Sequence, residues 1–267
     1  MSWQFDGRVA LVAGASKGIG AATAKAFAAA GAAVVLAARD AGRLEQVAAE
    51  IRADGGRALA VQADVGDVAS QQALVARALE AFGRLDFAFN NATDGPRPAP
   101  LHEIDPEQFD LGIRTNVRGT FLGMKFQVPA MLASGGGAIV NMASLAGVQG
   151  VANLGAYVAG KAGIIGLTRV AALDYADQNI RVNVVAPGTI LTWHLERAGE
   201  RAQQLAAQAT PMRRIGWVDE VARTVLWLCS SEASFITGAV IPIDGGQSAG
   251  TKPPQMYRQG ERMDAAG

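Results

Sequence analysis

The sequence predicts an α/β protein with a doubly wound, parallel, seven-stranded sheet and helices on both faces. Short runs of β-branched and aliphatic residues alternate with longer alanine-rich segments of helical periodicity, which is typical of βαβ units around a sheet buried on both faces. Half of the 267 residues are hydrophobic and only 18% are charged. The chain can therefore bury a large core, and its composition is not that of a disordered protein.

The expected elements alternate from the N-terminus onward. The strands are expected at residues 9–13, 33–38, 58–62, 85–90, 138–143, 180–186 and 239–243. The helices between them are expected at residues 18–30, 41–53, 68–82, 106–132, 154–176 and 218–229. This order describes an open doubly wound sheet of the kind that binds ligands beyond the carboxyl ends of its strands.

Two segments interrupt the alternation. Residues 188–212 follow the sixth strand with no strand directly after them, and they would lie over the ligand site, so we interpret them as a substrate lid. An ordinary helical excursion without a gating role is the alternative. Residues 247–267 contain Pro253 and Pro254 among many polar residues and are expected to form a C-terminal tail, which leaves residues 1–246 as one domain.

Charge and cysteine content exclude several classes of protein. The 24 Lys and Arg residues balance the 24 Asp and Glu residues, which excludes a strong electrostatic affinity for nucleic acid or an acidic membrane surface. Cys229 is the only cysteine, and His102 and His194 are the only histidines, so we expect no intrachain disulfide and no metal site. The N-terminus lacks signal-peptide features, and no apolar run reaches the roughly 18 residues of a spanning helix. We therefore expect a cytoplasmic protein.

A glycine-rich turn follows the first expected strand. It reads Gly14, Ala15, Ser16, Lys17, Gly18, Ile19, Gly20 and opens the first expected helix. Glycines allow the backbone to turn sharply and approach a pyrophosphate, and the helix N-terminus offers free N–H groups. The strand before it and the helix after it supply the context that this motif requires, although an ordinary glycine-rich turn is the alternative.

Four further side chains form a candidate catalytic set. Tyr157 and Lys161 are four residues apart on an expected helix and share one face. A lysine ammonium beside a phenol lowers a tyrosine pKa whose ordinary value is about 10, which makes the phenol a usable general acid and base. Ser144 ends the fifth strand, where its hydroxyl can bind a substrate oxygen. Asn116 lies inside the long expected helix, where asparagine is a poor helix former.

The spacing of the glycine turn and the order Asn116, Ser144, Tyr157, Lys161 resemble the short-chain dehydrogenase/reductase (SDR) family. The similarity covers about residues 7–246, and all four tetrad positions match. Ala13 stands where the family usually has Thr, and Thr93 where it has Gly, which puts the backbone there in question because Thr tolerates positive φ poorly. The resemblance implies one NAD(P)-binding Rossmann-type domain over residues 1–246, which includes the lid at about 188–212.

By the same resemblance, the protein is an NAD(P)-dependent enzyme that acts on CH–OH groups by hydride transfer. Tyr157 is expected to exchange the proton with the substrate oxygen, and Ser144 to orient that oxygen. Lys161 is expected to lower the Tyr157 pKa and bind the nicotinamide ribose, while Asn116 holds a water that links Lys161 to solvent. Further cofactor contacts are expected at Gly14, Ser16, Lys17, Gly18, Ile19, Gly20, Arg39, Asp64, Val65, Asn91, Ile190 and Thr192.

The residues after the second strand favour NADP(H) over NAD(H). Ala38 occupies the position that is acidic in NAD-binding members of the family, and Arg39 follows it. Arg39 and Lys17 would pair with a 2′-phosphate through charge-assisted hydrogen bonds. The alternative is that Asp40 contacts the ribose, which would make NAD(H) the cofactor.

The expected substrate is a moderately hydrophobic small molecule, a ketone or secondary alcohol, cyclic compounds included. Residues near the tetrad or the lid are expected to face it: Thr93, Asp94, Leu145, Gly147, Val151, Leu154, Gly188, Trp193, His194 and Met212. One alternative is a 3-oxoacyl-(acyl-carrier-protein) reductase, although residues 132–136 and 172–175 lack the Arg or Lys that an acidic carrier would need. A non-redox cofactor-binding role and a cyclase or isomerase activity also stay open. Family resemblance implies a homotetramer.

Overall fold

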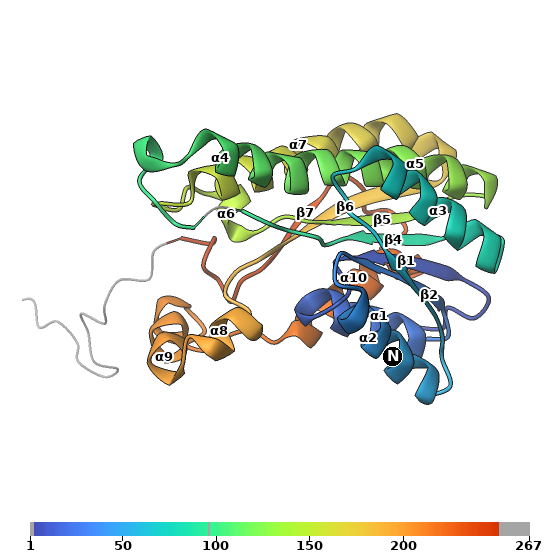
Figure 1. Ribbon diagram of the computed structural model, residues 1–267, viewed down its shortest axis with the longest axis horizontal. Coiled ribbons are helices and arrows are strands. Elements are labelled where there is room, and N and C mark those ends of the chain that lie inside the picture. The colour runs from blue at the N-terminus through green and yellow to red at the C-terminus, as the bar shows by residue number, and fades with distance from the viewer. Residues whose placement is uncertain (1–2, 96, 251–267) are drawn as a thin grey trace, which may run out of the picture.

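A computed structural model describes residues 3–95 and 97–250 and arranges them around a seven-stranded sheet (Figure 1). The sheet is parallel throughout, in the order β3-β2-β1-β4-β5-β6-β7. The strands are β1 (Val9–Ala13), β2 (Ala33–Ala38), β3 (Arg57–Gln62), β4 (Phe87–Asn90), β5 (Gly137–Met142), β6 (Ile180–Pro187) and β7 (Val240–Ile243). The expected fold class is confirmed. The chain order changes direction between β1 and β4, so the ligand crevice of such a sheet opens at their carboxyl ends.

Helices cover both faces of the sheet. Figure 1 shows α3, α4, α5 and α7 above it and α1, α2 and α10 below it. Their bounds are α1 (Gly18–Ala29), α2 (Ala41–Ala53), α3 (Val68–Phe82), α4 (Pro106–Ile113), α5 (Gly119–Ala133), α7 (Gly155–Tyr175) and α10 (Val218–Cys229). The two larger hydrophobic clusters of the core lie on opposite faces of the sheet. Val12 and Leu36 belong to the cluster under α1, α2 and α10, whereas Leu11 and Val35 belong to the other. Alternation along each strand thus supplies both layers.

The prediction of one uninterrupted helix at residues 106–132 is wrong. The structure divides it into α4, a π-helical turn (Arg114–Arg118) and α5. The Asn116 side chain explains the break, because its Nδ2 donates to the Gly112 carbonyl at 2.9 Å. That carbonyl, four residues earlier, is the acceptor that the Asn116 backbone N–H would use in a regular α-helix. A π-turn in a long helix is often associated with a functional site.

The segment at residues 188–212 contains two short helices. These are α8 (Trp193–Arg197) and α9 (Glu200–Ala209), which lie together at one end of the molecule, below the level of the sheet in Figure 1. A further short helix, α6 (Leu145–Val148), follows β5 and was not expected. Of the tail, residues 247–250 are described, and residues 251–267 lie outside the described residues.

One helical stretch departs from the expectation that no apolar run is long enough to span a membrane. Residues Gly155–Gln178, which include α7, are long and apolar enough to cross a membrane by length and composition, with a mean hydropathy of 1.2. In the structure α7 packs against β6 and buries Lys161, Ile164 and Thr168. Its composition is therefore explained by packing against the sheet, as in other core helices.

The amino end of the sheet is held by one carboxylate. Asp86 precedes β4, is only 2% exposed, and accepts hydrogen bonds from Arg8 Nη1 at 2.7 Å and from the Val9 N–H at 2.9 Å. Arg84 donates to it through Nε at 2.8 Å and Nη2 at 2.6 Å. Burial alone would raise the pKa of Asp86, but the hydrogen bonds from Arg84, Arg8 and Val9 hold it below its usual value.

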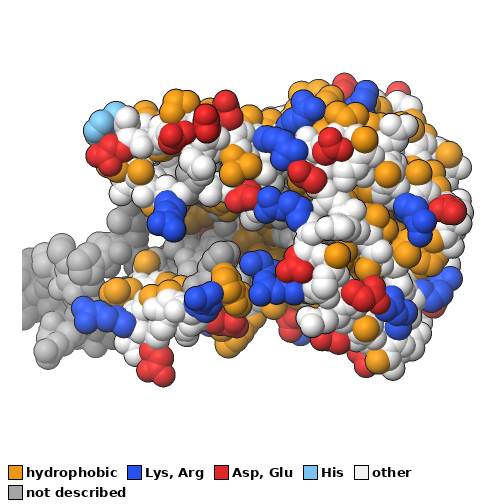
Figure 2. Space-filling view, viewed as in Figure 1, with side chains coloured by type: hydrophobic (Ala, Val, Ile, Leu, Met, Phe, Trp, Pro, Cys, Tyr) orange, Lys and Arg blue, Asp and Glu red, His pale blue; other side chains and the backbone are white. Residues whose placement is uncertain are grey.

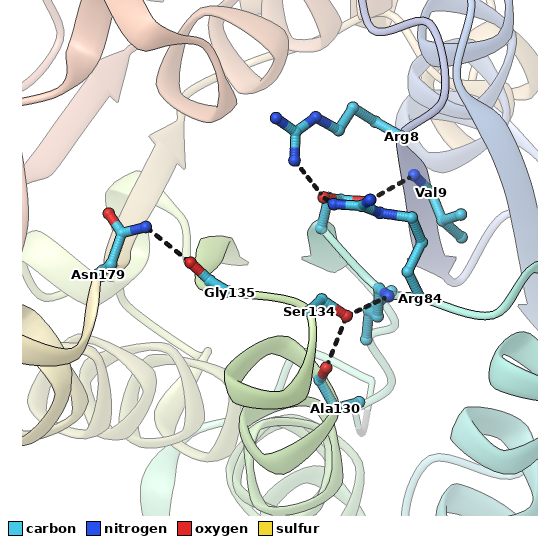
Figure 3. A network of polar contacts seen from close by, with 9 residues as sticks. Arg8, Val9, Arg84, Ala130, Ser134, Gly135 and Asn179 are labelled. Carbon is cyan, nitrogen blue, oxygen red and sulfur yellow. Dashed lines mark hydrogen bonds and ion pairs between the residues drawn. The ribbon is translucent and has the colours of Figure 1, made fainter.

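The same end of the sheet is tied to the helices above it. Ser134 Oγ accepts the Leu85 N–H at 3.1 Å and donates to the Ala130 carbonyl at 2.8 Å. Asn179 Nδ2 donates to the Gly135 carbonyl at 2.8 Å. Figure 3 shows this contact and the one between Ser134 and Ala130, with Arg8, Val9 and Arg84 nearby. These hydrogen bonds connect the end of α5 to the start of β4 and to the loop before β6.

Candidate active site

The glycine turn connects β1 to α1 at the carboxyl edge of the sheet. Gly14 has φ +77°, and a Cβ there would lie 2.8 Å from the Ala92 Cα. A Cβ on Gly20 would lie 2.1 Å from the Gly14 carbonyl oxygen. Asn91 Nδ2 donates to that same oxygen at 3.0 Å, so Asn91 holds the turn against the end of β4. Both positions accept only glycine, as the sequence predicts.

The N-terminus of α1 is open to an anion. Lys17 is its N-cap residue, and among the described residues no side chain caps it and no acidic residue lies in its first turn. Ser16, Gly18 and Ile19 are each partly exposed there. Uncapped N–H groups and the positive end of the helix dipole are the donor set that binds a phosphate.

Lys17 contacts the segment interpreted as a lid. Its Nζ lies 4.5 Å from the centroid of the Trp193 ring, and the Arg197 Cζ lies 4.6 Å from the same ring. Thr192 lies beside Gly18, since a Cβ built there would be 3.8 Å from the Thr192 Cγ2. The start of α8 thus lies against the glycine turn. Figure 2 shows a hollow between the upper helices and α8–α9, with Lys and Arg side chains along both sides.

The two residues after β2 have different partners. Asp40 caps α2, because its Oδ1 accepts the Arg43 N–H at 3.1 Å, and its Oδ2 lies 3.5 Å from Arg43 Nε. Arg39 instead reaches the far side of β1, where its Nη2 donates to Asp94 Oδ2 at 2.9 Å. The structure therefore gives Asp40 a helix-capping role and leaves Arg39 and Asp94 at the mouth of the crevice.

Asp64 and Val65 connect the end of β3 to the π-turn. Asp64 Oδ2 accepts from Arg114 Nη2 at 2.8 Å, and its Oδ1 accepts the Gly66 N–H at 2.9 Å. Burial alone would raise the pKa of Asp64. The hydrogen bonds from Arg114 and from the Gly66 N–H together outweigh burial and lower this pKa. Val65 packs against Gly119, where a Cβ would lie 2.9 Å from its Cγ2. The sequence gives no sign of Arg114 as a partner, because it lies 50 residues from Asp64.

Ser144, Tyr157 and Lys161 come together from two elements. Ser144 follows β5 and begins α6, with its Oγ accepting the Ala146 N–H at 3.2 Å. Tyr157 lies in the first turn of α7 and is hydrogen-bonded to Ser144. Lys161 lies one turn later and is fully buried. Its Nζ donates to the Met142 carbonyl at 2.9 Å and lies 5.5 Å from the centroid of the Tyr157 ring.

The lowering of the Tyr157 pKa by Lys161 stays a prediction, because burial and Ser144 are the causes that shift this pKa in the structure. Burial raises the pKa of Tyr157, and the hydrogen bond from Ser144 offsets only part of that rise. Burial also lowers the pKa of Lys161 to about 7. Lys161 is thus not a permanent cation near neutral pH, and its Nζ is turned to a carbonyl rather than to the phenol. A lysine that exchanges its proton near pH 7 suits proton transfer.

Asn116 is fully buried, and protein groups hold its amide on every side. Its Nδ2 donates to the Asp94 and Gly112 carbonyls at 2.7 and 2.9 Å, and its Oδ1 accepts the Thr93 hydroxyl at 2.9 Å. Thr93 is not among the residues with positive φ, so the substitution of Gly by Thr does not strain the backbone. Both N–H donors of the Asn116 side chain are already used by protein carbonyls. The role of Asn116 in holding a water stays a prediction.

Two glycines on α6 and α7 permit this close packing. A Cβ on Gly160 would lie 3.1 Å from the Asn116 Cβ, and one on Gly147 would lie 2.8 Å from the Lys161 carbonyl oxygen. Gly160 therefore allows α7 to approach the π-turn, at the expense of about 1 kcal/mol of helix propensity.

Ile190, Gly188 and Met212 lie beside the end of β7. Ile190 is buried and pairs with Gly216, and it lines a cavity of about 330 Å³ together with Met212 and Asp244. Gly188 donates its N–H to the Ile243 carbonyl, and a Cβ there would lie 2.3 Å from the Gln247 Oε1. Gly188 is thus packed against β7 and does not face an open pocket. The side chain of His194 lies outside what the structure describes.

Comparison with known proteins agrees with this geometry. The sequence model of a protein family described as Enoyl-(Acyl carrier protein) reductase matches residues 14–248. The chain belongs to the short-chain dehydrogenase/reductase family. A curated SDR relative, the A-factor type gamma-butyrolactone 1'-reductase (1S-forming) of Streptomyces virginiae, is 42% identical over 245 residues, which cover 90% of this chain and 95% of that protein.

Two other similarities extend over most of the chain. Cyclohexanol dehydrogenase of an Acinetobacter species (strain SE19) is 41% identical over 249 residues, which cover 93% of this chain and 98% of the relative. The solved structure of levodione reductase has a TM-score of 0.90 at 37% identity and covers 93% of this chain and all of that chain. This SDR is therefore an oxidoreductase of a family that uses a nicotinamide cofactor.

The residues present fit such a cofactor. The turn between Gly14 and Gly20 admits no side chain at either glycine, and the α1 N-terminus behind it is uncapped within the described part of the chain. These features leave backbone donors at the carboxyl edge, where a pyrophosphate binds in sheets of this kind.

Proposed function

We propose that this SDR interconverts a ketone and a secondary alcohol on a moderately hydrophobic small molecule, with NADP(H) as the cofactor. The observation that carries the proposal is the placement of Tyr157 beside Ser144 and the buried Lys161 at the carboxyl edge of the sheet. It combines an acid, an oxygen-binding hydroxyl and a proton-exchanging amine beyond the ends of β5 and β6.

The residues of this chain perform the proton chemistry. In the direction of reduction, the Tyr157 hydroxyl donates its proton to the substrate oxygen, and the Ser144 hydroxyl hydrogen-bonds the same oxygen. Lys161 exchanges its proton near neutral pH beside Tyr157 and thereby supplies the site with a proton-exchanging group, and Asn116 holds the π-turn that packs against α7. The cofactor, when bound, supplies the hydride that the carbonyl carbon accepts.

Arg39 and Lys17 support the choice of NADP(H). Arg39 is 63% exposed and extends over the crevice, where a guanidinium can bind a 2′-phosphate in a bidentate manner. Asp40, the group that would favour NAD(H), is engaged in capping α2. The remaining expected contacts, Gly14, Ser16, Gly18, Ile19, Gly20, Asp64, Val65, Asn91, Ile190 and Thr192, are proposed on the same basis.

The names of the relatives support a cyclic substrate. Besides the cyclohexanol dehydrogenase, a 2,5-dichloro-2,5-cyclohexadiene-1,4-diol dehydrogenase and a cis-4-hydroxycyclohexanecarboxylate dehydrogenase are each 42% identical to this chain. A six-membered carbocycle with one ring hydroxyl or ketone is therefore the first substrate class to test.

We also propose that the enzyme is a cytoplasmic homotetramer. Phe121 on α5 and Val170 and Leu173 on α7 are 47%, 56% and 84% exposed, which gives these helices an apolar outer surface suited to association. Light scattering should give about four times the 27.6 kDa chain mass. A monomer mass would contradict the assembly and leave the chemistry untouched.

The experiment that tests the function combines binding and turnover. Calorimetric titration with NADPH and with NADH should show tighter binding of NADPH, and oxidation of NADPH should then require a ketone from a panel of cyclohexanones. Equal or tighter binding of NADH would contradict the cofactor assignment. Turnover of a substrate with no change in the nicotinamide would favour the cyclase or isomerase alternative.

A further inference from the structure

A buried polar network joins two central strands to the helices α5 and α7. Asn90 at the end of β4 and Gln127 on α5 exchange two hydrogen bonds, at 3.1 and 2.8 Å. Asn90 Nδ2 also donates to Asn141 Oδ1 on β5 at 2.9 Å, and Asn141 Nδ2 donates to Thr168 Oγ1 on α7 at 3.0 Å. All four residues are at most 5% exposed. The proton chemistry of the proposed function uses none of them.

The Asn141 amide is held on both sides. Its Oδ1 accepts from Asn90, and its Nδ2 donates to the Thr168 hydroxyl. The other acceptor near this Nδ2 is Met124 Sδ at 3.4 Å, and a thioether is a weak acceptor. Thr168 donates its own proton to the Ile164 carbonyl at 2.8 Å, so its oxygen is left to accept from Asn141. A buried network whose members are paired in this way specifies one arrangement of the elements that it joins.

The contact between Asn141 and Thr168 attaches α7 to β5. Lys161 and Thr168 are seven residues apart, or about two helical turns, so they lie on the same face of α7. Lys161 donates to the carbonyl of Met142, which directly follows Asn141 on β5. The helix is therefore bonded to this strand at two levels, and both bonds have to change if α7 slides along β5.

We propose that Thr168 is a positioning residue for the reaction, which sets the distance between Tyr157 and Ser144 by holding α7 in register with β5. The inference rests on the proposed function, because these two hydroxyls belong to that site. Tyr157 is carried by α7, and Ser144 comes two residues after the end of β5, so a shift of the helix along the strand changes their separation. Thr168 itself lies eleven residues from Tyr157, about 16 Å along the helix, and takes no direct part in the chemistry.

The effect should appear in kcat. Thr168→Val keeps the shape of the side chain and removes the hydroxyl, which leaves the Asn141 amide with only the weak sulfur acceptor. The loss of one such hydrogen bond corresponds to a fall in kcat of about five- to tenfold, and small displacements of reacting groups are costly in rate. The affinity for NADPH should change little, because Thr168 acts on β5, whereas the glycine turn belongs to β1 and α1.

The test compares Thr168→Val with Thr168→Ser. Serine keeps the hydroxyl that accepts from Asn141 and should restore most of kcat, although it removes the methyl group that packs in the core. Steady-state kinetics with a cyclohexanone give kcat, calorimetry gives the NADPH dissociation constant, and a thermal melt checks that both variants are folded. Equal kcat values for the two variants, or a loss of NADPH affinity as large as the loss of kcat, would overturn the inference.

Thr224→Val is the matched control. Thr224 Oγ1 donates to the Glu220 carbonyl, four residues earlier on α10, at 2.9 Å, as Thr168 does to Ile164 on α7. Within the described residues, however, no side chain donates to Thr224. The control should therefore lose helix stability and keep its kcat. An equal fall in kcat in Thr224→Val and Thr168→Val would assign the effect to the local threonine bond and overturn the inference.

Crystal structures of the two Thr168 variants separate this inference from the proposed function. The distance from Ser144 Oγ to Tyr157 Oη should be longer in Thr168→Val than in Thr168→Ser. An equal distance would overturn the role of Thr168 even if the enzyme reduces ketones. Failure of the unaltered enzyme to reduce any ketone would overturn the proposed function alone, because this distance is measured without turnover.

Discussion

The two edges of the sheet each bury a charged side chain, with opposite results. At the amino edge, Asp86 receives hydrogen bonds from Arg8, Val9 and Arg84, and its pKa is lowered despite its burial (Figure 3). At the carboxyl edge, Lys161 donates to one carbonyl, and within the described residues no carboxylate pairs with it. Burial then lowers its pKa to about 7.

The difference in partners between Asp86 and Lys161 suits the first residue to stabilising the fold and the second to proton transfer. A buried ion with several partners keeps its charge and links the elements that contact it, so it stabilises the fold. A buried amine without a counter-ion exchanges its proton near neutral pH, which suits proton transfer. Substitutions at the two edges should therefore affect different measurements.

The largest effect is expected at the carboxyl edge. Tyr157→Phe removes the proton donor and keeps the ring, so kcat should fall about 10²- to 10⁴-fold while the affinity for NADPH changes little. Steady-state kinetics and calorimetry measure the two quantities. Retained turnover would assign the proton transfer to another group, and a matching loss of NADPH affinity would indicate a structural defect.

At the amino edge, the effect should appear in stability instead. Asp86→Ala leaves Arg8, Arg84 and the Val9 N–H without their acceptor, and we expect unfolding to become about 2–3 kcal/mol easier, since both arginines still reach water. Denaturant titration measures this, with Glu80→Ala in an exposed pair on α3 as the control. A large loss of kcat in folded Asp86→Ala would show that the two edges are not independent.

The buried Lys161 amine should make the stability of the protein depend on pH. The pKa of Lys161 is about 7 in the folded protein and near its ordinary 10.5 when unfolded. Between these values the unfolded state binds the extra proton, so stability should rise with pH in this window and be constant below it. Relative to Lys161→Met, the free energy of unfolding should rise by about 2 kcal/mol from pH 7 to pH 9. Parallel curves for the two proteins would show that the Lys161 pKa is not lowered.

A smaller effect is expected at Thr93. Thr93→Val removes the hydroxyl that donates to the buried Asn116 Oδ1, so kcat should fall about three- to tenfold, in line with one lost hydrogen bond. Thr93→Ser keeps the hydroxyl and should restore most of the rate. Equal rates for the Val and Ser variants would show that this hydrogen bond does not position Asn116.

Much of this fold follows from local pattern. Alternation of aliphatic runs with alanine-rich segments placed β1, β2, α2, α3 and α10 at their observed bounds. The two strands are short aliphatic runs that are buried throughout, and each helix buries a face whose period is visible in the sequence. The division at Asn116 was not visible, since it depends on a side chain that takes the Gly112 carbonyl from the helix. The π-turn is thus a tertiary effect on local structure.

The candidate site divides in the same way. Motif spacing indicated Gly14, Gly20, Ser144, Tyr157 and Lys161, but not the direction of the Tyr157 pKa, because a four-residue spacing says nothing about burial. The Arg39–Asp94 pair joins residues 55 apart. Only the order of the strands brings them together.

Isotope transfer tests whether the carboxyl edge of this sheet is an NADP(H)-dependent redox site. NADPH carrying deuterium at both C4 positions is incubated with the enzyme and a cyclohexanone, and the product is analysed by mass spectrometry and NMR. We expect a cyclohexanol with one deuterium on the carbinol carbon, formed by the unaltered enzyme and not by Tyr157→Phe. A product without deuterium, or an isomer formed while the NADPH stays unchanged, would contradict it.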